Sequence, residues 1–174
     1  MLDYIFVFQP NEYKSAMNLF IEYSNWLNID LSFQKFDEEL KMLKTMYGDP
    51  HGCIILCKNE NDFVGCVAVR KIEEGVAELK RMYVKPEFQR MGIGENLLKL
   101  SINFACEKGY KTIKLDTLNT MKPAMNLYVK HGFVETSAYY FNPEPTAVYF
   151  ELKAPFPNPS PESESPLNPP RGKF

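Results

Sequence analysis

The sequence predicts a single α/β (α+β) domain with about six or seven strands and about four helices, and three observations lead to this fold class. Runs with strand-like and helix-like hydrophobic patterns follow one another over most of the chain. The composition, with 45% hydrophobic and 24% charged residues among 174, suits one globular core. Near the middle, at residues 83–98, a strand leads through a glycine-rich turn into a helix. We therefore expect residues 1–153 to form one domain.

The first part of the chain is predicted to hold one strand and two helices. Residues 4–8 are predicted to form an apolar strand. The run over residues 1–8 is short, carries Asp3 and lacks a basic leader, so a strand is expected there and not a signal peptide. Apolar residues at spacings of three and four predict a helix over residues 12–27. A second helix over residues 33–43 is expected to begin at Ser32, which can cap it.

Strands dominate the next part. Residues 53–58, 63–72 and 76–84 are apolar or alternating runs separated by turns rich in Asn, Asp, Glu and Gly. Beyond the glycine turn, a broad apolar face predicts a helix that begins near Ile93 and ends at Gly109.

The last ordered part is predicted to close the sheet. Residues 112–117 form a strand, and Pro123 suits the first turn of a helix that ends near His131. Residues 133–136 and 147–152 are predicted closing strands. An exposed edge at residues 147–152 could pair with a second subunit, so a homodimer stays open.

The composition changes at residue 154. More than half of the chain's 13 prolines lie in residues 154–174, mixed with Ser and Glu and with few hydrophobic residues. Such a segment buries too little apolar surface to offset the entropy lost on ordering. It is predicted to be a disordered, Pro/Ser-rich tail, with a partner-binding or lid segment as the alternative.

Composition also excludes several classes of function. A net charge of −2 argues against a basic field for nucleic acid. No apolar run is long enough to cross a bilayer. The four cysteines form no CxxC pair, and the two histidines have no ligand spacing, so no metal is expected. We predict a cytoplasmic protein with reduced cysteines and no membrane or nucleic-acid partner.

The glycine turn carries the chemistry. The first N–H groups of a helix have no partner within it, and the helix dipole adds partial positive charge there. Gly92 and Gly94 remove the Cβ atoms that would keep phosphates away from these donors. Arg90 can add a charge-assisted hydrogen bond. The turn therefore predicts a pyrophosphate-binding cradle.

Rival phosphate-binding motifs fit the two glycines less well. A Walker P-loop needs Lys followed by Ser or Thr, and neither pair follows these glycines. The Rossmann fingerprint needs a third glycine, where Leu97 stands. A helix that merely starts with glycines does not account for the preceding Gln89 and Arg90.

Residues 89–94, Gln-Arg-Met-Gly-Ile-Gly, match the (Q/R)-x-x-G-x-(G/A) signature of the GNAT superfamily of N-acetyltransferases. Residues 79–87 resemble the family's L-x-x-L-x-V-x-P-x strand, and residues 124–133 resemble its A-x-x-L-Y-x-x-x-G-F helix. Residues 139–143 are similar to a segment in a subgroup of small uncharacterised members. The resemblance spans residues 4–153. It implies the GNAT fold, a mixed, mostly antiparallel, twisted sheet flanked by helices.

The resemblance implies acetyl-CoA as co-substrate. In the family, the pantetheine arm pairs like an extra strand with the backbone of the preceding strand, here Met82, Tyr83 and Val84. A backbone N–H near Met82 would polarise the acetyl carbonyl. The pyrophosphate would bind the loop formed by Gln89, Arg90, Met91, Gly92, Ile93, Gly94 and Glu95.

One position departs from the family pattern. Many members have Asn three residues before the motif alanine, where it contacts pantetheine; this chain has Met121 there. Asn119 and Asn126 are the candidates to take over that contact, with Asn119 better placed at the end of a strand.

The implied reaction is attack of a neutral amine on the thioester. A free alkylamine has a pKa of about 10.4, so it must lose a proton to a carboxylate, directly or through water. Glu78 is the candidate base; the alternatives are a surface carboxylate paired with Lys80 or Arg81, and a water chain. Tyr128 occupies the family position of the acid that protonates the leaving thiolate; the alternative is a core tyrosine.

We therefore predict an N-acetyltransferase that moves acetyl from acetyl-CoA to a primary amine of a small molecule. A peptide or protein amine is an alternative acceptor, and a non-catalytic acyl-CoA sensor is an alternative function. Tyr139 or Tyr140 is a candidate contact for the acceptor, with core packing as the alternative.

Overall fold

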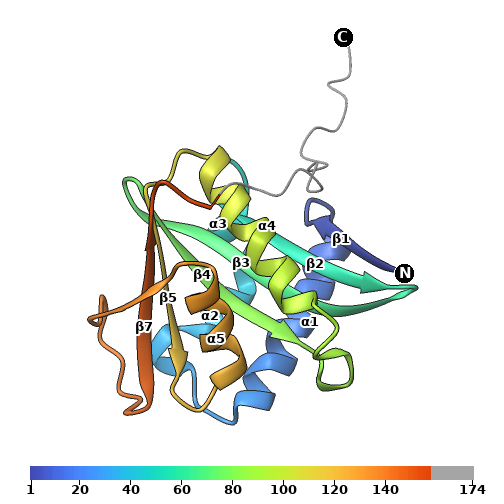
Figure 1. The fold of residues 1–174 in the computed structure, drawn as a ribbon. Coiled ribbons are helices and arrows are strands. Elements are labelled where there is room, and N and C mark those ends of the chain that lie inside the picture. Colours follow the sequence, from blue (N-terminus) through green and yellow to red (C-terminus); the bar gives the residue numbers. More distant parts are fainter. Residues whose placement is uncertain (158–174) are drawn as a thin grey trace.

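The computed structural model describes residues 1–157, and within them one sheet of seven strands is flanked by five α-helices (Figure 1). The strands are β1 (Leu2–Phe6), β2 (Cys53–Asn59), β3 (Asp62–Glu73), β4 (Val76–Val84), β5 (Thr112–Leu118), β6 (Val134–Thr136) and β7 (Ala147–Lys153). The α-helices are α1 (Pro10–Leu27), α2 (Phe36–Lys41), α3 (Leu43–Tyr47), α4 (Ile93–Glu107) and α5 (Lys122–Lys130). Two short 3₁₀ turns, η1 (Ser32–Gln34) and η2 (Pro86–Phe88), complete the set.

The sheet has the order β1-β2-β3-β4-β5-β7-β6, and its neighbours are antiparallel except for β4 and β5. This parallel pair is short: residues 76–78 of β4 pair with residues 112–114 of β5. Beyond Glu78 the two strands diverge, as their ribbons show in Figure 1. The sheet is therefore split at its centre.

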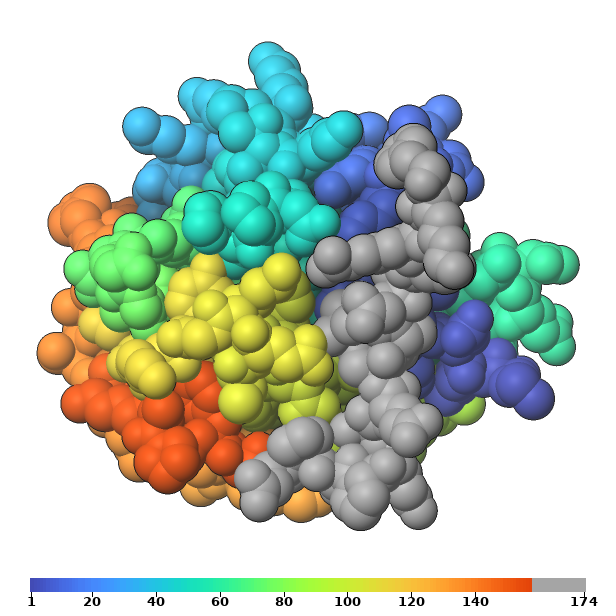
Figure 2. Space-filling view, turned by 90° about the horizontal axis from the view of Figure 1, so that it is seen from above, coloured from blue at the N-terminus to red at the C-terminus, as the bar shows by residue number. Residues whose placement is uncertain are grey.

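Helices cover both faces of this sheet, and the alternation of side chains along β2 shows why. Ile55 and Cys57 enter the core cluster that includes α4, whereas Ile54 and Leu56 enter the cluster that includes α1, α2 and α3. Seen from above, the region of α4 (yellow) lies between the cyan region and the region of β7 (red) (Figure 2). A strand with two apolar faces must be covered on both.

The structure confirms the predicted fold class of a mixed, mostly antiparallel sheet with flanking helices. The first strand begins two residues earlier than expected and ends at Phe6. The single helix predicted over residues 33–43 is instead η1, α2 and α3. Lys35 has φ +55°, which interrupts a continuous helix and lets Phe36, Glu39 and Leu43 turn toward the sheet.

The predicted edge at residues 147–152 is wrong. β7 pairs with β5 on one side and with β6 on the other, so the edges of the sheet are β1 and β6. The predicted tail, residues 154–174, lies outside the described residues from residue 158 onward and stays a prediction. Within the described chain, every helix is too short or too polar to cross a membrane.

Candidate active site

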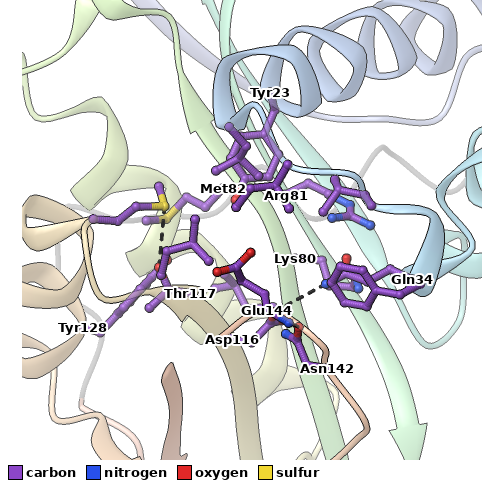
Figure 3. Close-up of a pocket in the computed structure, with 17 residues that line it drawn as sticks. Tyr23, Gln34, Lys80, Arg81, Met82, Asp116, Thr117, Tyr128, Asn142 and Glu144 are labelled. Atoms are coloured by element: carbon purple, nitrogen blue, oxygen red, sulfur yellow. Dashed lines mark hydrogen bonds between the residues drawn. The ribbon is translucent and has the colours of Figure 1, made fainter. Parts of the chain in front are cut away.

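A cavity of ≈ 50 Å³ lies where β4 and β5 diverge (Figure 3). We call it the splay cavity. β4 contributes residues 79–82 to its wall and β5 contributes residues 116–118. The other walls come from the end of α1, η1, α5 and the loop over residues 137–146. Segments distant in sequence therefore meet around one small space.

A bulge shapes the β4 wall. Opposite β3, Lys80 pairs with Ala68 and Tyr83 pairs with Cys66, so two residues of β4 stand against one of β3. Arg81, in this bulge, has φ +56°. Since residues 79–84 of β4 also have no β5 partner, their backbone offers a strand edge that an extended amide chain can pair with.

Buried charges hold the bulge in place. Arg81 donates from Nη2 to Oε2 of Glu39 at 2.6 Å and from Nε to Oε1 at 3.1 Å. The Tyr47 hydroxyl also donates to Glu39 Oε1, at 2.6 Å. Burial would raise the pKa of Glu39, but Arg81 outweighs this and lowers it. This bidentate pair ties α2 to the β4 wall.

The predicted phosphate loop, residues 89–95, joins β4 to α4. Gly92 caps the helix with φ +81°, and Arg90 has φ +63°. Within the described chain, the backbone N–H groups of residues 90–95 have no backbone acceptor. Gln89 donates from its side chain to the Val84 carbonyl at 3.1 Å, which closes the loop onto β4. These free donors at a helix start fit a pyrophosphate.

The two glycines have different roles in the protein itself. The φ of Gly92 strongly favours glycine. A Cβ added at Gly94 would meet Leu127 Cδ1 at 3.6 Å, an ordinary contact. The protein alone therefore does not require glycine at residue 94, whereas an approaching phosphate would.

Glu95 at the start of α4 connects the loop to α5. Its carboxylate lies 2.8 Å from Lys130 Nζ and 2.9 Å from His131 Nε2. Hydrogen bonds from Lys130 and His131 lower the pKa of Glu95 to about 2. This contact fixes the position of α5, which carries Tyr128.

Tyr128 borders the splay cavity from α5. Its ring packs against Phe133 and Phe150, with centroids 5.8 and 6.0 Å away, and the residue is 4% exposed. Burial raises the pKa of the Tyr128 phenol, so it stays protonated at neutral pH. Tyr128 thus packs in the core, as the alternative stated, and also borders the cavity (Figure 3). Its role as the acid stays a prediction.

The other predicted cofactor residues are spread around the splay cavity and the phosphate loop. Met82 lines the cavity. The Tyr83 side chain turns away and packs on Tyr23 and Trp26 of α1, with centroids 5.6 and 5.8 Å away. Asn119 and Asn126 are exposed and do not line the cavity, where Met121 does.

Glu78, the predicted base, lies directly before the divergence of the strands and is 2% exposed. It is 2.8 Å from Arg70 Nε and 3.7 Å from Lys80 Nζ, and it accepts a hydrogen bond from the Tyr139 hydroxyl at 2.6 Å. Burial alone would raise the pKa of Glu78, but Lys80, Arg70 and Tyr139 outweigh it and lower the pKa. It is therefore a buried, paired carboxylate and no surface group.

Asp116 on β5 is a cavity-lining carboxylate that the sequence pattern did not single out. Its Oδ2 accepts a hydrogen bond from Tyr140 Oη at 2.8 Å. It accepts a second one from Gln34 Nε2 at 3.4 Å (Figure 3). Burial raises its pKa, opposed in part by Lys80. Tyr139 and Tyr140, the predicted acceptor contacts, do not line the cavity; Tyr140 bonds to Asp116, which does, and Tyr139 bonds to Glu78, which lies next to the cavity-lining Leu79 along β4.

The fold and the site together define a class of protein. A split sheet offers a free strand edge, a helix start offers unpaired N–H donors, and a closed cavity with titratable groups lies between them. This is the arrangement of an acyltransferase that takes a CoA thioester.

Comparison with known proteins agrees with this class. The model of the acetyltransferase (GNAT) family matches residues 20–133. An uncharacterized N-acetyltransferase of Schizosaccharomyces pombe is 38% identical over 146 residues, covering 83% of this chain and 90% of its own. The chain therefore belongs to the GNAT family of acetyltransferases, which confirms the predicted family, enzyme class and co-substrate.

Solved structures show the same fold. An acetyltransferase of the GNAT family from Staphylococcus aureus has a TM-score of 0.73 at 20% identity, over 88% of this chain and 99% of its own. The PaiA N-acetyltransferase of Thermoplasma acidophilum, solved in complex with coenzyme A, has a TM-score of 0.69 at 17% identity, over 88% of this chain and 99% of its own.

Proposed function

We propose that this acetyltransferase acetylates the primary amine of a small molecule, with acetyl-CoA as the acetyl donor. The observation that carries the proposal is the splay cavity, which joins the free edge of β4 to a narrow space closed by the loop over residues 137–146. Both tyrosines of this loop bond to carboxylates beneath it. A slender amine fits such a space better than a folded protein surface does.

The residues that would hold acetyl-CoA are those of the phosphate loop and β4. The N–H groups of residues 90–95 would bind the pyrophosphate, and the backbone of residues 82–84 would pair with the pantetheine amides. The bound thioester supplies the activated acetyl group. Asn119 and Asn126 stay predictions, since their side chains lie outside the cavity.

Two groups of the chain would act on the reacting atoms. The backbone N–H at Met82, beside the bulge, would stabilise negative charge on the acetyl oxygen. Tyr128 would give a proton to the departing sulfur, since its phenol is protonated and borders the cavity. The predicted base Glu78 stays a prediction, and its three partners leave it little capacity for a further proton donor.

An amine panel tests the proposal. Purified protein with acetyl-CoA is mixed with small primary amines, lysine-containing peptides or no acceptor, and the released CoA thiol is measured. We expect release with small amines and a mass increase of one acetyl group on the product. Release only with peptides would refute the small-molecule acceptor. Binding of acetyl-CoA without release would indicate a sensor.

We also propose a cytoplasmic location. Among the described residues, Cys53, Cys57 and Cys66 are buried free thiols and Cys106 is an exposed one. An exposed free thiol is typical of a reducing compartment. Fractionation of cells expressing the tagged protein tests this, and recovery from a secreted or membrane fraction would contradict it.

A further inference from the structure

The splay cavity contains a carboxylate without an ionic partner, and this feature deepens the proposed function. Among the described residues, Glu78 has ion pairs with Arg70 and Lys80, and Glu39 has one with Arg81. Asp116 has none. Lys80 and Arg81, the cations that face it from β4, are thus already engaged by other carboxylates. Glu144, the other carboxylate that lines the cavity, also has no ion pair among the described residues, and its Oε1 accepts hydrogen bonds from the N–H and the hydroxyl of Thr146. The cavity therefore presents two carboxylates without an ion pair, of which Asp116 is the one on β5.

Gln34, which donates a hydrogen bond to Asp116, supplies an unsatisfied acceptor beside it. Its Oε1 is the one buried side-chain oxygen or nitrogen in the described chain that has no hydrogen-bond partner. Buried polar atoms in native proteins nearly always have a partner, so a hydrogen-bond donor bound at this atom would be stabilised.

The hydrogen bonds fix the orientation of the Gln34 amide. Tyr140 donates its proton to Asp116 Oδ2, so Tyr140 Oη can accept from Gln34 Nε2 at 2.9 Å. The reversed amide would set its oxygen against Tyr140 Oη and Asp116 Oδ2, neither of which has a proton to give. Oε1 therefore faces away from this network, as an acceptor.

We propose that Asp116 and Gln34 Oε1 bind the ammonium group of the acceptor, and that Asp116 then removes its proton. Both hydrogen bonds to Asp116 end on Oδ2, which leaves Oδ1 for the ligand. An ammonium ion has only donors and one positive charge, so it matches two free acceptors and one uncompensated carboxylate.

The proton and electron balance is complete without another reactant. Asp116 takes one proton from the ammonium, and the neutral nitrogen forms a bond to the acetyl carbon. The C–S bond breaks with its electron pair on sulfur. The thiolate takes a proton from Tyr128, and the nitrogen passes its second proton to the Tyr128 phenolate. Asp116 then returns its own proton to water. Glu78 is a poorer base because it already accepts hydrogen bonds from Arg70 and Tyr139 and forms an ion pair with Lys80.

The test compares Asp116→Asn and Gln34→Leu with Asp37→Asn, an exposed carboxylate on α2 that undergoes the same chemical change. Binding is measured first, as the rise in melting temperature of each protein with butylammonium. Tetramethylammonium at equal ionic strength serves as the blank, because it has the charge but no N–H donor. We expect butylammonium to raise the melting temperature of wild type and Asp37→Asn, to raise that of Gln34→Leu less, and to leave Asp116→Asn unchanged.

Turnover is measured next, as CoA thiol released with butylamine, putrescine and phenethylamine. We expect Asp116→Asn to lower kcat/KM for the amine by about 10²–10⁴-fold. The acidic limb of the pH profile should disappear in this variant, whereas Glu78→Gln should keep it.

The two readouts separate the two proposals. Equal binding of butylammonium by wild type and Asp116→Asn, or binding by neither, overturns the ammonium site whatever the turnover. Loss of the acidic limb in Glu78→Gln but not in Asp116→Asn overturns Asp116 as the base. Ammonium binding that depends on Asp116, with no CoA release from any amine, supports the ammonium site and refutes the proposed transfer reaction.

Discussion

The two walls of the splay cavity differ in how the chain builds them. The β4 wall, with the phosphate loop, comes from one continuous stretch, residues 79–95, and its buried charges are all paired. The β5 wall joins Asp116 to Gln34, 82 residues away, and to Tyr140 in a third segment. Its carboxylate has no ionic partner among the described residues. In the function proposed above, the first wall binds acetyl-CoA, and the second presents charge to the acceptor.

The largest expected effect comes from breaking the ion pair that joins the β4 wall to α2. Glu39→Ala leaves the buried Arg81 guanidinium without its carboxylate. Removing one partner of a buried pair costs about 3–5 kcal/mol, so we expect the free energy of unfolding to fall by that amount in urea titrations. Glu38→Ala, at an exposed neighbouring position on α2, is the control and should change it by less than about 0.5 kcal/mol. Equal effects of both variants would show that the pair does not hold the bulge.

The next effect concerns Tyr128, which lies between the walls. Tyr128→Phe keeps the ring packed on Phe133 and Phe150 and removes only the hydroxyl. We expect kcat to fall about 10²-fold, with little change in the dissociation constant for acetyl-CoA measured by calorimetry. Unchanged turnover would rule out Tyr128 as the acid.

A smaller effect separates the two glycines of the phosphate loop. Gly92→Ala forces a side chain into φ +81°, which costs about 1–2 kcal/mol, so both stability and acetyl-CoA affinity should fall. A Cβ at residue 94 makes only ordinary contacts, with Leu127 at 3.6 Å and Val84 at 3.9 Å, so the stability of Gly94→Ala should not fall. If Gly94→Ala still weakens acetyl-CoA binding in calorimetry, the phosphate approaches that residue closely. Normal affinity in Gly94→Ala would place the phosphate elsewhere along the loop.

The same difference between the walls explains how far the sequence could predict the site. Hydrophobic periods and turn residues determine strands and helices locally, so β2, β3 and β4 were predicted to within one residue at each end. The phosphate loop is equally local, because its donors are successive N–H groups of one turn. Residues 33–43 were mispredicted because burial against the sheet, rather than local propensity, breaks that segment.

The β5 wall could not be predicted in the same way. Asp116 alternates with the buried Ile113, Leu115 and Thr117, so in sequence it has the pattern of a solvent-facing strand residue. Only the return of the loop over residues 137–146 and the placement of η1 enclose it. The edge predicted at β7 was wrong for a related reason, since the short β6 pairs outside it.

The smallest expected effect is on how the free energy of unfolding depends on pH, and it differs between Glu78 and Asp116. The pKa of Glu78 is lowered in the folded protein, so its ionised form contributes stability above the ordinary Glu pKa, and this contribution is lost as pH falls through the folded pKa. The pKa of Asp116 is raised in the folded protein. At pH values between its pKa in the unfolded state and its pKa in the folded state, the folded state therefore binds more protons. Its favourable contribution is present below the ordinary Asp pKa and is lost as pH rises through the folded pKa.

Amide variants therefore have opposite expected effects. At pH 7, Asp116→Asn should be as stable as wild type or up to about 1 kcal/mol more stable, because a buried charge without an ionic partner is removed. This gain should shrink as pH falls. Glu78→Gln should be less stable than wild type at pH 7, and its deficit should shrink toward acid pH. Urea unfolding at a series of pH values measures both differences. A stability gain at pH 7 in Glu78→Gln, or a loss in Asp116→Asn, would mean that the paired carboxylate is on β5 and not on β4. The proposed ammonium site at Asp116 would then be wrong.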